Sequence, residues 1–386
     1  MPPTQILLSA GEASGDMYAA RLATELKKRA DVEIFGMGGA QMRAAGVDVV
    51  TDYSEVAVLG ITEIIKHLPQ LRHAMRNLVE QARLRKPALA ILTDFPGFHL
   101  RLARKLKPLG GKNIYYICPQ FWAWRPWRAN LVRRRFALGL CIFPFEEKFF
   151  RDADANVKFI GHPLVGEVRP SLSRTDFAAK HGLDASAKTI AVLPGSRRGE
   201  ILRHLPTMLE GVRELQREGK DPLNVVLALA HDADSKEFQH LVPEEMKTIV
   251  VQGDTYSALA ASDAALICSG TATVEAALLD VPTVVVYKVS KLTAVLVKPL
   301  IRTKFFGMVN LIAEREVAPE LIQDEFTPQN IAREILQLLE PARAARAHAD
   351  LAEVRRRLGP PGAVERAAEA ILALLPASLE RSGNAS

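Results

Sequence analysis

The feature that most constrains this sequence is a repeated alternation of short apolar runs with longer stretches of helical periodicity. The runs cover residues 5–8, 89–92 and 114–117 in the first half, and 189–193, 224–229, 248–251, 264–267 and 283–287 in the second. Strands that alternate with helices predict βαβ units and a parallel sheet. Because the alternation occurs in both halves, we expect an α/β protein with two doubly wound, Rossmann-like domains.

The break between the two series of strands indicates where the first domain ends. His162-Pro163 and Arg169-Pro170 interrupt regular structure, and polar residues cluster up to Ser173. We therefore expect an N-terminal domain over residues 1–165 and a second domain over 166–342. Helical patterns then predict a separate helical segment over 343–376, followed by a disordered tail over 377–386.

Composition and charge narrow the classes of function. The 386 residues are 48% hydrophobic and 24% charged, which is ordinary for a folded globular chain. The net charge of +6 allows anionic partners, but no long basic segment interleaves with aromatic residues, so we expect no nucleic acid partner. The three cysteines lack C-x-x-C spacing and no His/Cys cluster has metal-ligand spacing, so we predict neither a disulfide framework nor a metal site.

The apolar stretches bear on where the chain acts. Residues 1–9 lack the basic and apolar regions of a secretion signal. The most apolar later stretch, residues 289–313, is interrupted by lysines and arginines, so it does not resemble a membrane-spanning helix. We expect a cytoplasmic chain that does not cross a membrane.

Two loops of the first half carry residues suited to a ligand site. The loop after residues 5–8 reads Gly11-Glu12-Ala13-Ser14-Gly15-Asp16, and its glycines would let a substrate approach backbone N–H groups at a helix start. A tight turn capped by Ser14 or Asp16 explains these residues equally well. Asp94 follows the strand over 89–92, at the edge where open α/β sheets bind ligands, and is a candidate general base or a helix cap.

The tryptophans are concentrated in one place. Trp122, Trp124 and Trp127 are the only ones in the chain, and Arg125 stands among them. The rings either cover the edge of the core or line a sugar or lipid site in which Arg125 faces a phosphate.

The second half contains a pair of similar loops. In the first, a strand ends at Leu193 and is followed by Pro194 and then Gly195, Ser196 and Arg197; in the second, a strand is followed by Ser269, Gly270 and Thr271, with Glu275 one helical turn on. Free N–H groups, a guanidinium and a carboxylate suit a diphosphate and a ribose. Each loop alone could be an ordinary βα turn, but together they favour a nucleotide diphosphate. No Walker motif is present, which argues against an ATPase.

One stretch suggests contact with lipid. Residues 58–71 place several large apolar side chains close together, with Lys66, Arg72 and Arg76 flanking them; the apolar residues are Leu59, Ile61, Ile64, Ile65, Leu68 and Leu71. An apolar surface rimmed by cations can lie in a bilayer interface, whereas the alternative is an amphipathic helix facing the core.

The combination of these motifs resembles the lipid-A-disaccharide synthase family of bacterial inverting glycosyltransferases. The resemblance covers residues 6 to about 339 and rests on Gly11–Asp16, Asp94-Phe95-Pro96, Trp122-Ala123-Trp124-Arg125, Phe159-Ile160-Gly161-His162, Leu193-Pro194-Gly195-Ser196-Arg197, Ser269-Gly270-Thr271 with Glu275, and Asn310-Leu311-Ile312. It implies the GT-B architecture, in which two Rossmann-like domains face each other across a cleft and C-terminal helices return to the first domain.

The resemblance also implies a reaction in lipid A and lipopolysaccharide synthesis of Gram-negative bacteria. The enzyme would transfer 2,3-diacylglucosamine from UDP-2,3-diacylglucosamine to 2,3-diacylglucosamine 1-phosphate, forming a β-1,6 linkage and releasing UDP. No metal or other cofactor is expected. The family further implies a homodimer, and acyl chains on both substrates favour peripheral attachment to the inner leaflet of the inner membrane.

Site roles carry over from the family by position. Asp94 would accept the proton of the acceptor 6-hydroxyl, Arg197 with the Gly/Ser loops would stabilise the leaving diphosphate, and Glu275 would hold the ribose. Asn310 would lie near the nucleotide. The loop over Gly11, Glu12, Ser14, Gly15 and Asp16 would face the acceptor, together with Trp124 and Arg125.

The sequence departs from the family at Gly97, where a second aspartate is frequent. Two alternatives remain: a related UDP-N-acetylglucosamine epimerase or transferase, and a nucleotide-binding module without catalytic activity.

Overall fold

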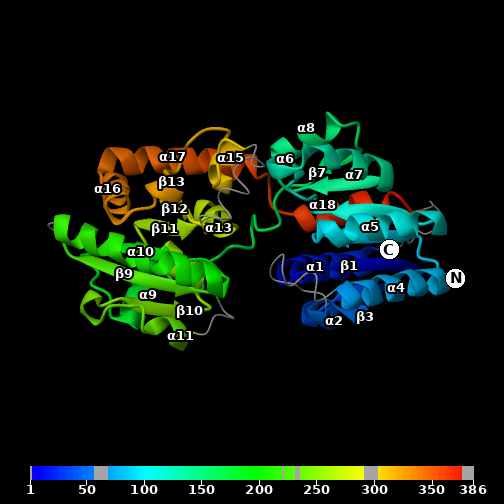
Figure 1. Ribbon diagram of the computed structural model, residues 1–386, viewed down its shortest axis with the longest axis horizontal. Coiled ribbons are helices and arrows are strands. Elements are labelled where there is room, and N and C mark those ends of the chain that lie inside the picture. The colour runs from blue at the N-terminus through cyan, green and yellow to red at the C-terminus, as the bar shows by residue number, and fades with distance from the viewer. Residues whose placement is uncertain (1, 56–67, 220, 231–234, 291–302, 376–386) are drawn as a thin grey trace, which may run out of the picture. The chain divides into compact units, whose positions relative to one another are not determined.

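The computed structural model describes residues 2–55, 68–219, 221–230, 235–290 and 303–375. The chain forms two compact units, one within residues 1–163 and 360–386 and the other within residues 164–359 (Figure 1). Each unit has its own parallel sheet with helices between successive strands. This confirms the prediction of an α/β chain with two doubly wound domains.

The first unit is built around a sheet whose described strands have the order β3-β2-β1-β4-β5-β6-β7. The strands are β1 (Thr4–Ala10), β2 (Val32–Gly38), β3 (Asp48–Asp52), β4 (Leu89–Thr93), β5 (Lys112–Tyr116), β6 (Leu138–Cys141) and β7 (Val157–Phe159). The helices are α1 (Ala13–Arg29), α2 (Ala40–Ala44), α4 (Leu68–Arg85), α5 (Pro96–Leu106), α6 (Phe121–Trp124), α7 (Ala129–Arg135), α8 (Pro144–Arg151) and α18 (Ala363–Leu372), with the 3-10 helices η1 (Tyr53–Glu55), η2 (Lys107–Leu109) and η3 (Pro126–Arg128).

The central strands of this sheet are buried because their apolar runs are covered on both faces. All of β4 and the last five residues of β1 are inaccessible. Helix α5 packs against α4 on one side and α7 on the other, while α1 packs against α18. The core of the unit therefore positions the two ends of α5 and the loop that precedes it.

The second unit contains a sheet whose described strands have the order β10-β9-β8-β11-β12-β13. The strands are β8 (Lys188–Leu193), β9 (Leu223–Leu229), β10 (Ile249–Gln252), β11 (Ala264–Cys268), β12 (Thr283–Tyr287) and β13 (Glu320–Ile322). The helices are α9 (Arg174–His181), α10 (Arg198–Glu218), α11 (Ser235–Gln239), α12 (Thr255–Ala260), α13 (Ala272–Leu278), α15 (Met308–Ala313), α16 (Pro328–Leu339) and α17 (Pro341–Arg357), with the 3-10 helices η4 (Glu244–Met246) and η6 (Gln323–Glu325).

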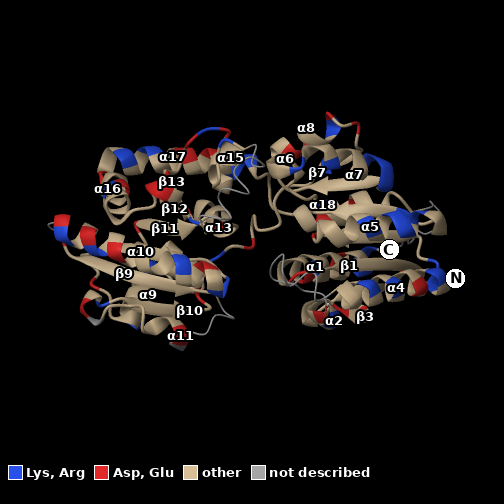
Figure 2. Ribbon diagram, in the orientation of Figure 1, with Lys and Arg blue, Asp and Glu red and all other residues tan. Residues whose placement is uncertain are grey.

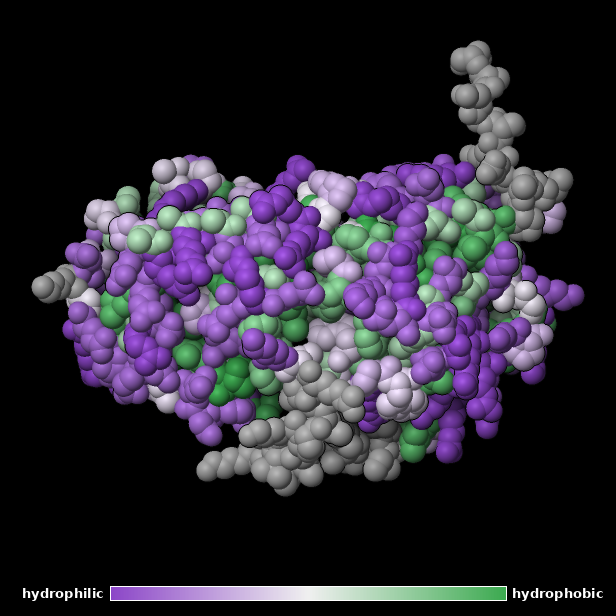
Figure 3. All heavy atoms as spheres, turned by 90° about the horizontal axis from the view of Figure 1, so that it is seen from above, coloured by the Kyte–Doolittle hydropathy of each residue, from purple (hydrophilic) through white to green (hydrophobic). Residues whose placement is uncertain are grey.

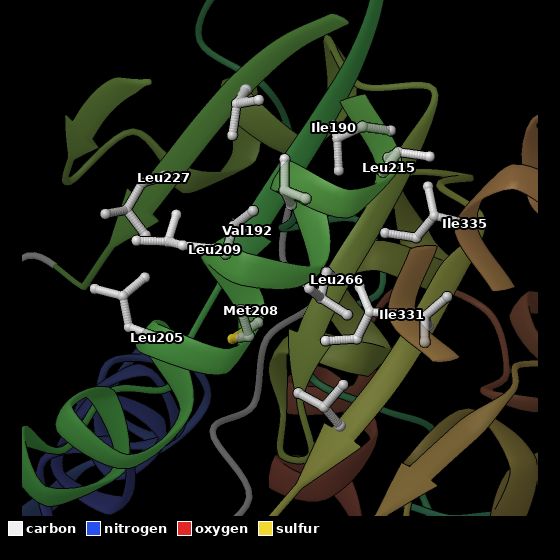
Figure 4. Packing of buried hydrophobic residues seen from close by; sticks show 14 of the residues in the cluster. Ile190, Val192, Leu205, Met208, Leu209, Leu215, Leu227, Leu266, Ile331 and Ile335 are labelled. Carbon is white, nitrogen blue, oxygen red and sulfur yellow. The ribbon is translucent and has the colours of Figure 1, made fainter. Parts of the chain in front are cut away.

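Helix α10 anchors the core of the second unit. Its Met208 and Leu209 pack with strand residues such as Leu227 and with Ile331 of α16 (Figure 4). A Cβ on Gly211 would come within 2.6 Å of the Ile331 side chain, so glycine lets α10 and α16 approach closely. The start of α10 is thereby fixed relative to the sheet.

The C-terminal helices divide between the two units, which corrects the expected organisation. Helix α17 packs against α13, α15 and α16 of the second unit, and only α18 packs against α1 of the first. The apolar face of α17 finds its partners on the second unit, so residues 343–376 are not one crossover segment. The first of the two segments that form the first unit ends at Pro163, two residues before the expected boundary. The expected tail lies outside the described residues.

Hydrophilic side chains cover most of the face seen in Figure 3, and hydrophobic side chains appear between them in patches. Among the described residues, none of the helices combines the length and the apolar character that crossing a bilayer requires.

Candidate active site

Each sheet has a point where the strand order reverses. Strand β1 lies between β2 and β4, and β8 lies between β9 and β11. The loops after β1 and β4, and after β8 and β11, therefore diverge at the carboxyl ends of the strands, where open α/β sheets bind ligands. All four loops predicted from the sequence follow these four strands.

In the second unit, this crevice opens into a cavity of about 1080 Å³. Most of the residues predicted to contact the nucleotide line it: Gly195, Ser196, Arg197, Ser269, Gly270, Thr271 and Glu275. The two Gly/Ser loops are far apart in the sequence, and the parallel pairing of β8 with β11 brings them side by side.

The loop after β8 requires its glycine. Gly195 has φ +119°, and a Cβ there would lie 2.9 Å from Glu200 Oε2. Glu200 accepts hydrogen bonds from the Arg197 backbone N–H (3.4 Å) and guanidinium (3.1 Å), which closes a capping box at the start of α10. The exposed Arg197 guanidinium retains further donors for an anion near the N-terminus of this long helix.

The loop after β11 leaves backbone donors available. Ser269 fixes the loop, because its N–H donates to the Val286 carbonyl (2.9 Å) and its hydroxyl to the Phe306 carbonyl (2.8 Å). The N–H groups of Gly270 and Thr271 donate no hydrogen bond within the described parts of the chain. Two adjacent unused donors in a cavity are suited to a phosphate oxygen.

Glu275 lies in the same cavity, on α13. Burial raises the pKa of Glu275, while a hydrogen bond from the Tyr256 hydroxyl (3.4 Å) acts in the opposite direction. The carboxylate is therefore an acceptor positioned by a neighbouring hydroxyl, as a ribose-binding group would be.

The cavity also has residues that sequence reasoning missed. Gln252 ends β10, and Asp254 and Tyr256 follow it; all three line the cavity. The sequence carried a signal, because a Gly-Asp pair follows the predicted strand over 248–251. The sequence did not reveal that the loop after β10 lines the same cavity as the two Gly/Ser loops.

Asn310 is predicted from family resemblance to lie near the nucleotide. Its side chain is fully buried, donates to the Ala318 carbonyl and Glu320 Oε1 (both 2.7 Å), and accepts from the N–H groups of Val317 (2.7 Å) and Ala318 (2.9 Å). Its hydrogen-bonding capacity is used within the protein. Asn310 therefore holds α15 to the segment before β13, and its expected position near the nucleotide stays a prediction.

In the first unit, the backbone at Asp94 is held in an uncommon conformation. Asp94 and Phe95 have φ +56° and +43°, in the left-handed region that non-glycine residues rarely adopt. Two donors hold the Asp94 carbonyl: His99 Nδ1 at 2.8 Å and the Tyr115 hydroxyl at 2.9 Å. Ser9 Oγ lies 2.8 Å from His99 Nε2. Burial lowers the pKa of His99 to about 4, so its ring is neutral at pH 7 and Nε2 accepts from Ser9.

The loop over residues 11–16 packs directly on Asp94 and Phe95. A Cβ on Gly11 would come within 2.5 Å of the Phe95 ring, and one on Gly15 would lie 2.9 Å from Asp94 Oδ2. Burial, together with the negative charge of Glu12, raises the pKa of Asp94 to about 7. A carboxyl with this pKa can accept a proton near neutral pH, as a general base must.

Asp16 does not point to a substrate, which corrects its assignment. Its buried carboxylate accepts hydrogen bonds from the backbone N–H groups of Gly39 (2.6 Å), Gln41 (3.0 Å) and Met42 (3.3 Å). It thus joins α1 to the start of α2. Asp16 caps α2, whereas the sequence suggested that it could cap the helix that follows its own loop. Glu12 and Ser14 are exposed, and their contact with an acceptor stays a prediction.

The tryptophans have separate environments. Trp122 donates from Nε1 to the buried Glu146 (3.1 Å) and so belongs to the core edge. Trp124 is 40% exposed, and the Arg125 guanidinium stacks on its ring at 4.3 Å. The Arg128 guanidinium lies 5.5 Å from the rings of Trp124 and Trp127. Trp124 and Arg125 therefore form a surface patch whose contact with a substrate stays a prediction.

The residues predicted to meet the membrane are only partly described. Leu59, Ile61, Ile64 and Ile65 lie outside the described residues. Leu68, at the start of α4, is 38% exposed, whereas Leu71 packs partly against the core. Among the described residues, no group of three or more His, Cys, Asp or Glu side chains could hold a metal ion. Independence from metals stays a prediction.

Comparison with known proteins identifies the family. The family model described as lipid-A-disaccharide synthetase matches residues 6–374. The lipid-A-disaccharide synthase of Solibacter usitatus (strain Ellin6076) is 46% identical over 374 residues, which cover 96% of this chain and 97% of that protein. That of Myxococcus xanthus (strain DK1622) is 44% identical over 377 residues, covering 97% and 98%. The chain belongs to the lipid-A-disaccharide synthase family.

Solved structures share the fold of this family member at low sequence identity. A UDP-GlcNAc 2-epimerase from Neisseria meningitidis bound to UDP-GlcNAc is similar with a TM-score of 0.65 and 13% identity, over 96% of this chain and 100% of that chain. The calicheamicin glycosyltransferase CalG4 has a TM-score of 0.61 and 17% identity over the whole of both chains. The synthase family member thus has the fold of GT-B glycosyltransferases and epimerases.

Proposed function

We propose that this chain transfers 2,3-diacylglucosamine from UDP-2,3-diacylglucosamine to 2,3-diacylglucosamine 1-phosphate, the reaction of its family. The observation that carries the proposal at the level of residues is the position of Asp94. This residue follows β4 at the reversal point of the first sheet, and its carboxyl has a pKa of about 7. His99 and Tyr115 hold its backbone carbonyl.

The second unit would bind the UDP part of the donor. The unused N–H groups of Gly270 and Thr271, together with Arg197, are suited to the two phosphates, and Glu275 is suited to the ribose hydroxyls. These donors would also stabilise the charge that develops on the diphosphate as its bond to the anomeric carbon breaks.

The first unit would bind the acceptor. Deprotonated Asp94 takes the proton of the acceptor 6-hydroxyl while the oxygen of that hydroxyl attacks the anomeric carbon of the donor. One carbon–oxygen bond forms as the bond between the anomeric carbon and UDP breaks. A single displacement inverts the configuration and gives the β linkage. Gly97 carries no carboxylate, and a Cβ there would meet open space, so Asp94 acts without a second acid at that position.

Peripheral attachment to a membrane and a homodimer belong to the proposal as well. The exposed Leu68 beside Arg72 and Arg76 on α4 supports membrane attachment, because apolar side chains next to cations suit the surface of an anionic bilayer. The dimer rests on family resemblance alone.

The test is release of UDP from UDP-2,3-diacylglucosamine in detergent micelles containing EDTA, with and without 2,3-diacylglucosamine 1-phosphate. We expect release that depends on the acceptor and persists in EDTA. Release without acceptor, or turnover of UDP-N-acetylglucosamine that has no acyl chains, would contradict the proposal. Restoration of activity only by added Mg²⁺ would contradict metal independence.

A further inference from the structure

A cationic pocket of about 470 Å³ lies between α5 and α7 in the first unit. Its lining combines a short apolar floor that includes Leu100, Leu131 and Trp127 with five cations; the cations are Arg101, Arg104, Lys105, Arg128 and Arg135. Lysine and arginine gather on α5 and α7 in Figure 2. No acidic residue is among the lining residues of this pocket in the described chain.

These cations lack acidic partners. None of the five forms an ion pair with an acidic side chain in the described ranges, although other arginines of the unit, such as Arg133 and Arg151, do. The Arg128 Nε atom is buried without a hydrogen-bond partner there. Burial and then the charges of Arg125 and Arg101 lower the pKa of Arg128, so like charges oppose one another in this cluster. A bound anion would accept a hydrogen bond from the buried Nε atom and would offset the repulsion between the like charges.

An apolar groove lies on the other side of α5 and meets the pocket. The groove, of about 540 Å³, is formed between α4 and α5 by Leu68, Leu71, Met75, Phe95 and Phe98. Gly97, Arg101 and Lys105 line both the groove and the pocket. A ligand that fits both has an apolar part and an anionic part, which describes a phosphorylated lipid.

The place where groove and pocket meet is next to the base. Gly97 follows Asp94 by three residues and is exposed, and a Cβ added to it would have no described atom within 4 Å. Arg101 lies four residues further along α5, about 6 Å in rise, which is close to the span of one sugar ring. A sugar with its hydroxyl at Asp94 would thus direct a phosphate on its far side toward the cations.

We propose that the pocket between α5 and α7 binds the 1-phosphate of the lipid acceptor, while the adjoining groove receives apolar chain. This rests on the proposed function and extends it to a phosphate monoester site to which Arg104 contributes a guanidinium. Arg104 is exposed and has no hydrogen bond to other described residues, so its replacement should not disturb the fold.

The experiment compares Arg104→Gln with the matched control Arg83→Gln, an exposed arginine on α4 that lines neither pocket nor groove. UDP release is measured with 2,3-diacylglucosamine 1-phosphate and with the same lipid lacking its phosphate. We expect Arg104→Gln to raise KM about tenfold for the phosphorylated acceptor only, with KM for the donor unchanged. Arg104→Lys should recover part of the loss, and Arg83→Gln should match the wild type.

Two results would overturn the phosphate site. One is an equal rise in KM for both acceptors. The other is unchanged kinetics with weaker binding to phosphatidylglycerol vesicles, which would show that the cations only meet an anionic surface. Absence of acceptor-dependent turnover in the wild type would instead contradict the proposed function. The site would then be tested by equilibrium binding of 2,3-diacylglucosamine 1-phosphate micelles and of inorganic phosphate, which Arg104→Gln should weaken.

Discussion

At the scale of single residues, the environment of Asp94 has two parts with different effects. His99 and Tyr115 bind its carbonyl and hold a backbone conformation that would otherwise be costly. Glu12 and burial act on its carboxyl and raise the pKa to about 7. The first part sets the direction of the side chain, and the second sets the pH at which it can act as a base.

The pH dependence of catalysis follows from this pKa. Because the base must be deprotonated, kcat/KM should fall as pH decreases below about 7. Glu12→Gln removes a negative charge, lowers the pKa of Asp94 and should move this acid limb to lower pH. The measurement is kcat/KM from pH 5 to 9, with Glu80→Gln on α4 as the control. An acid limb at the same pH in Glu12→Gln would argue against Asp94 as the titrating group.

In the same assay, Asp94→Asn should reduce kcat by about 10²- to 10⁴-fold with UDP binding retained.

At the scale of elements, the nucleotide cavity depends on how tightly the loop after β8 turns into α10. Gly195 occupies a backbone region reserved for glycine and lies against Glu200, whose side chain caps the helix. Four residues later, Gly199 is exposed and has open space around it. The two glycines therefore allow the turn and the helix to be perturbed separately.

Gly195→Ala should weaken UDP binding at least tenfold, because alanine cannot adopt this φ without a shift of the loop. Gly199→Ala lies in the first turn of α10 and should leave UDP binding unchanged with equal or slightly higher stability. Isothermal titration with UDP measures the first effect and thermal unfolding the second. Equal UDP affinity of Gly195→Ala and wild type would show that the loop does not contact the nucleotide.

At the scale of the whole molecule, the chain passes between its two units twice, after Pro163 and after Gly359. The second passage brings α18 onto α1 of the first unit, where Ile371 is fully buried. Arg366 donates to the Ile160 carbonyl at 2.8 Å and to the carbonyls of Pro360 and Pro361, which fixes the start of the returning segment. The first unit is therefore completed by α18.

Ile371→Ala should lower the free energy of unfolding of the first unit by about 2–5 kcal/mol, since it leaves a cavity between α18 and α1. Leu84→Ala is the control, because Leu84 is 70% exposed on α4 and its removal should have little effect. Urea unfolding measures the difference, and UDP binding by the second unit should be unaffected. Equal unfolding of both variants would mean that α18 adds nothing to the first unit.

The elements that could be predicted from the sequence are those with continuous apolar runs. Strands such as β4 and β11 are buried on both faces, so their composition reveals them. Strands β2, β3, β6, β7 and β13 were not predicted. Strand β2 contains two glycines, β3 begins and ends with aspartate, and β7 and β13 have three residues each. These segments form strands because they pair with a neighbouring strand, and their own residues do not reveal it.

The candidate site could be predicted where a residue acts close to its own strand. Asp94 directly follows β4 and Gly195 lies two residues after β8, and their positions came from the sequence alone. Asp16 was misassigned because its hydrogen-bond partners lie around the start of α2, a segment that sequence patterns do not place beside it. Tyr256 was missed since only the sheet order brings its loop to Glu275.

Because α18 belongs to the first unit, the two units can finish folding only in a fixed order during synthesis. The second unit is one continuous segment, so it can finish folding once Gly359 and the residues before it have left the ribosome. The first unit begins earlier but must wait for the last helix to emerge. A chain released early would thus retain a finished second unit while its first unit stays unfinished, a state that proteases and chaperones can recognise.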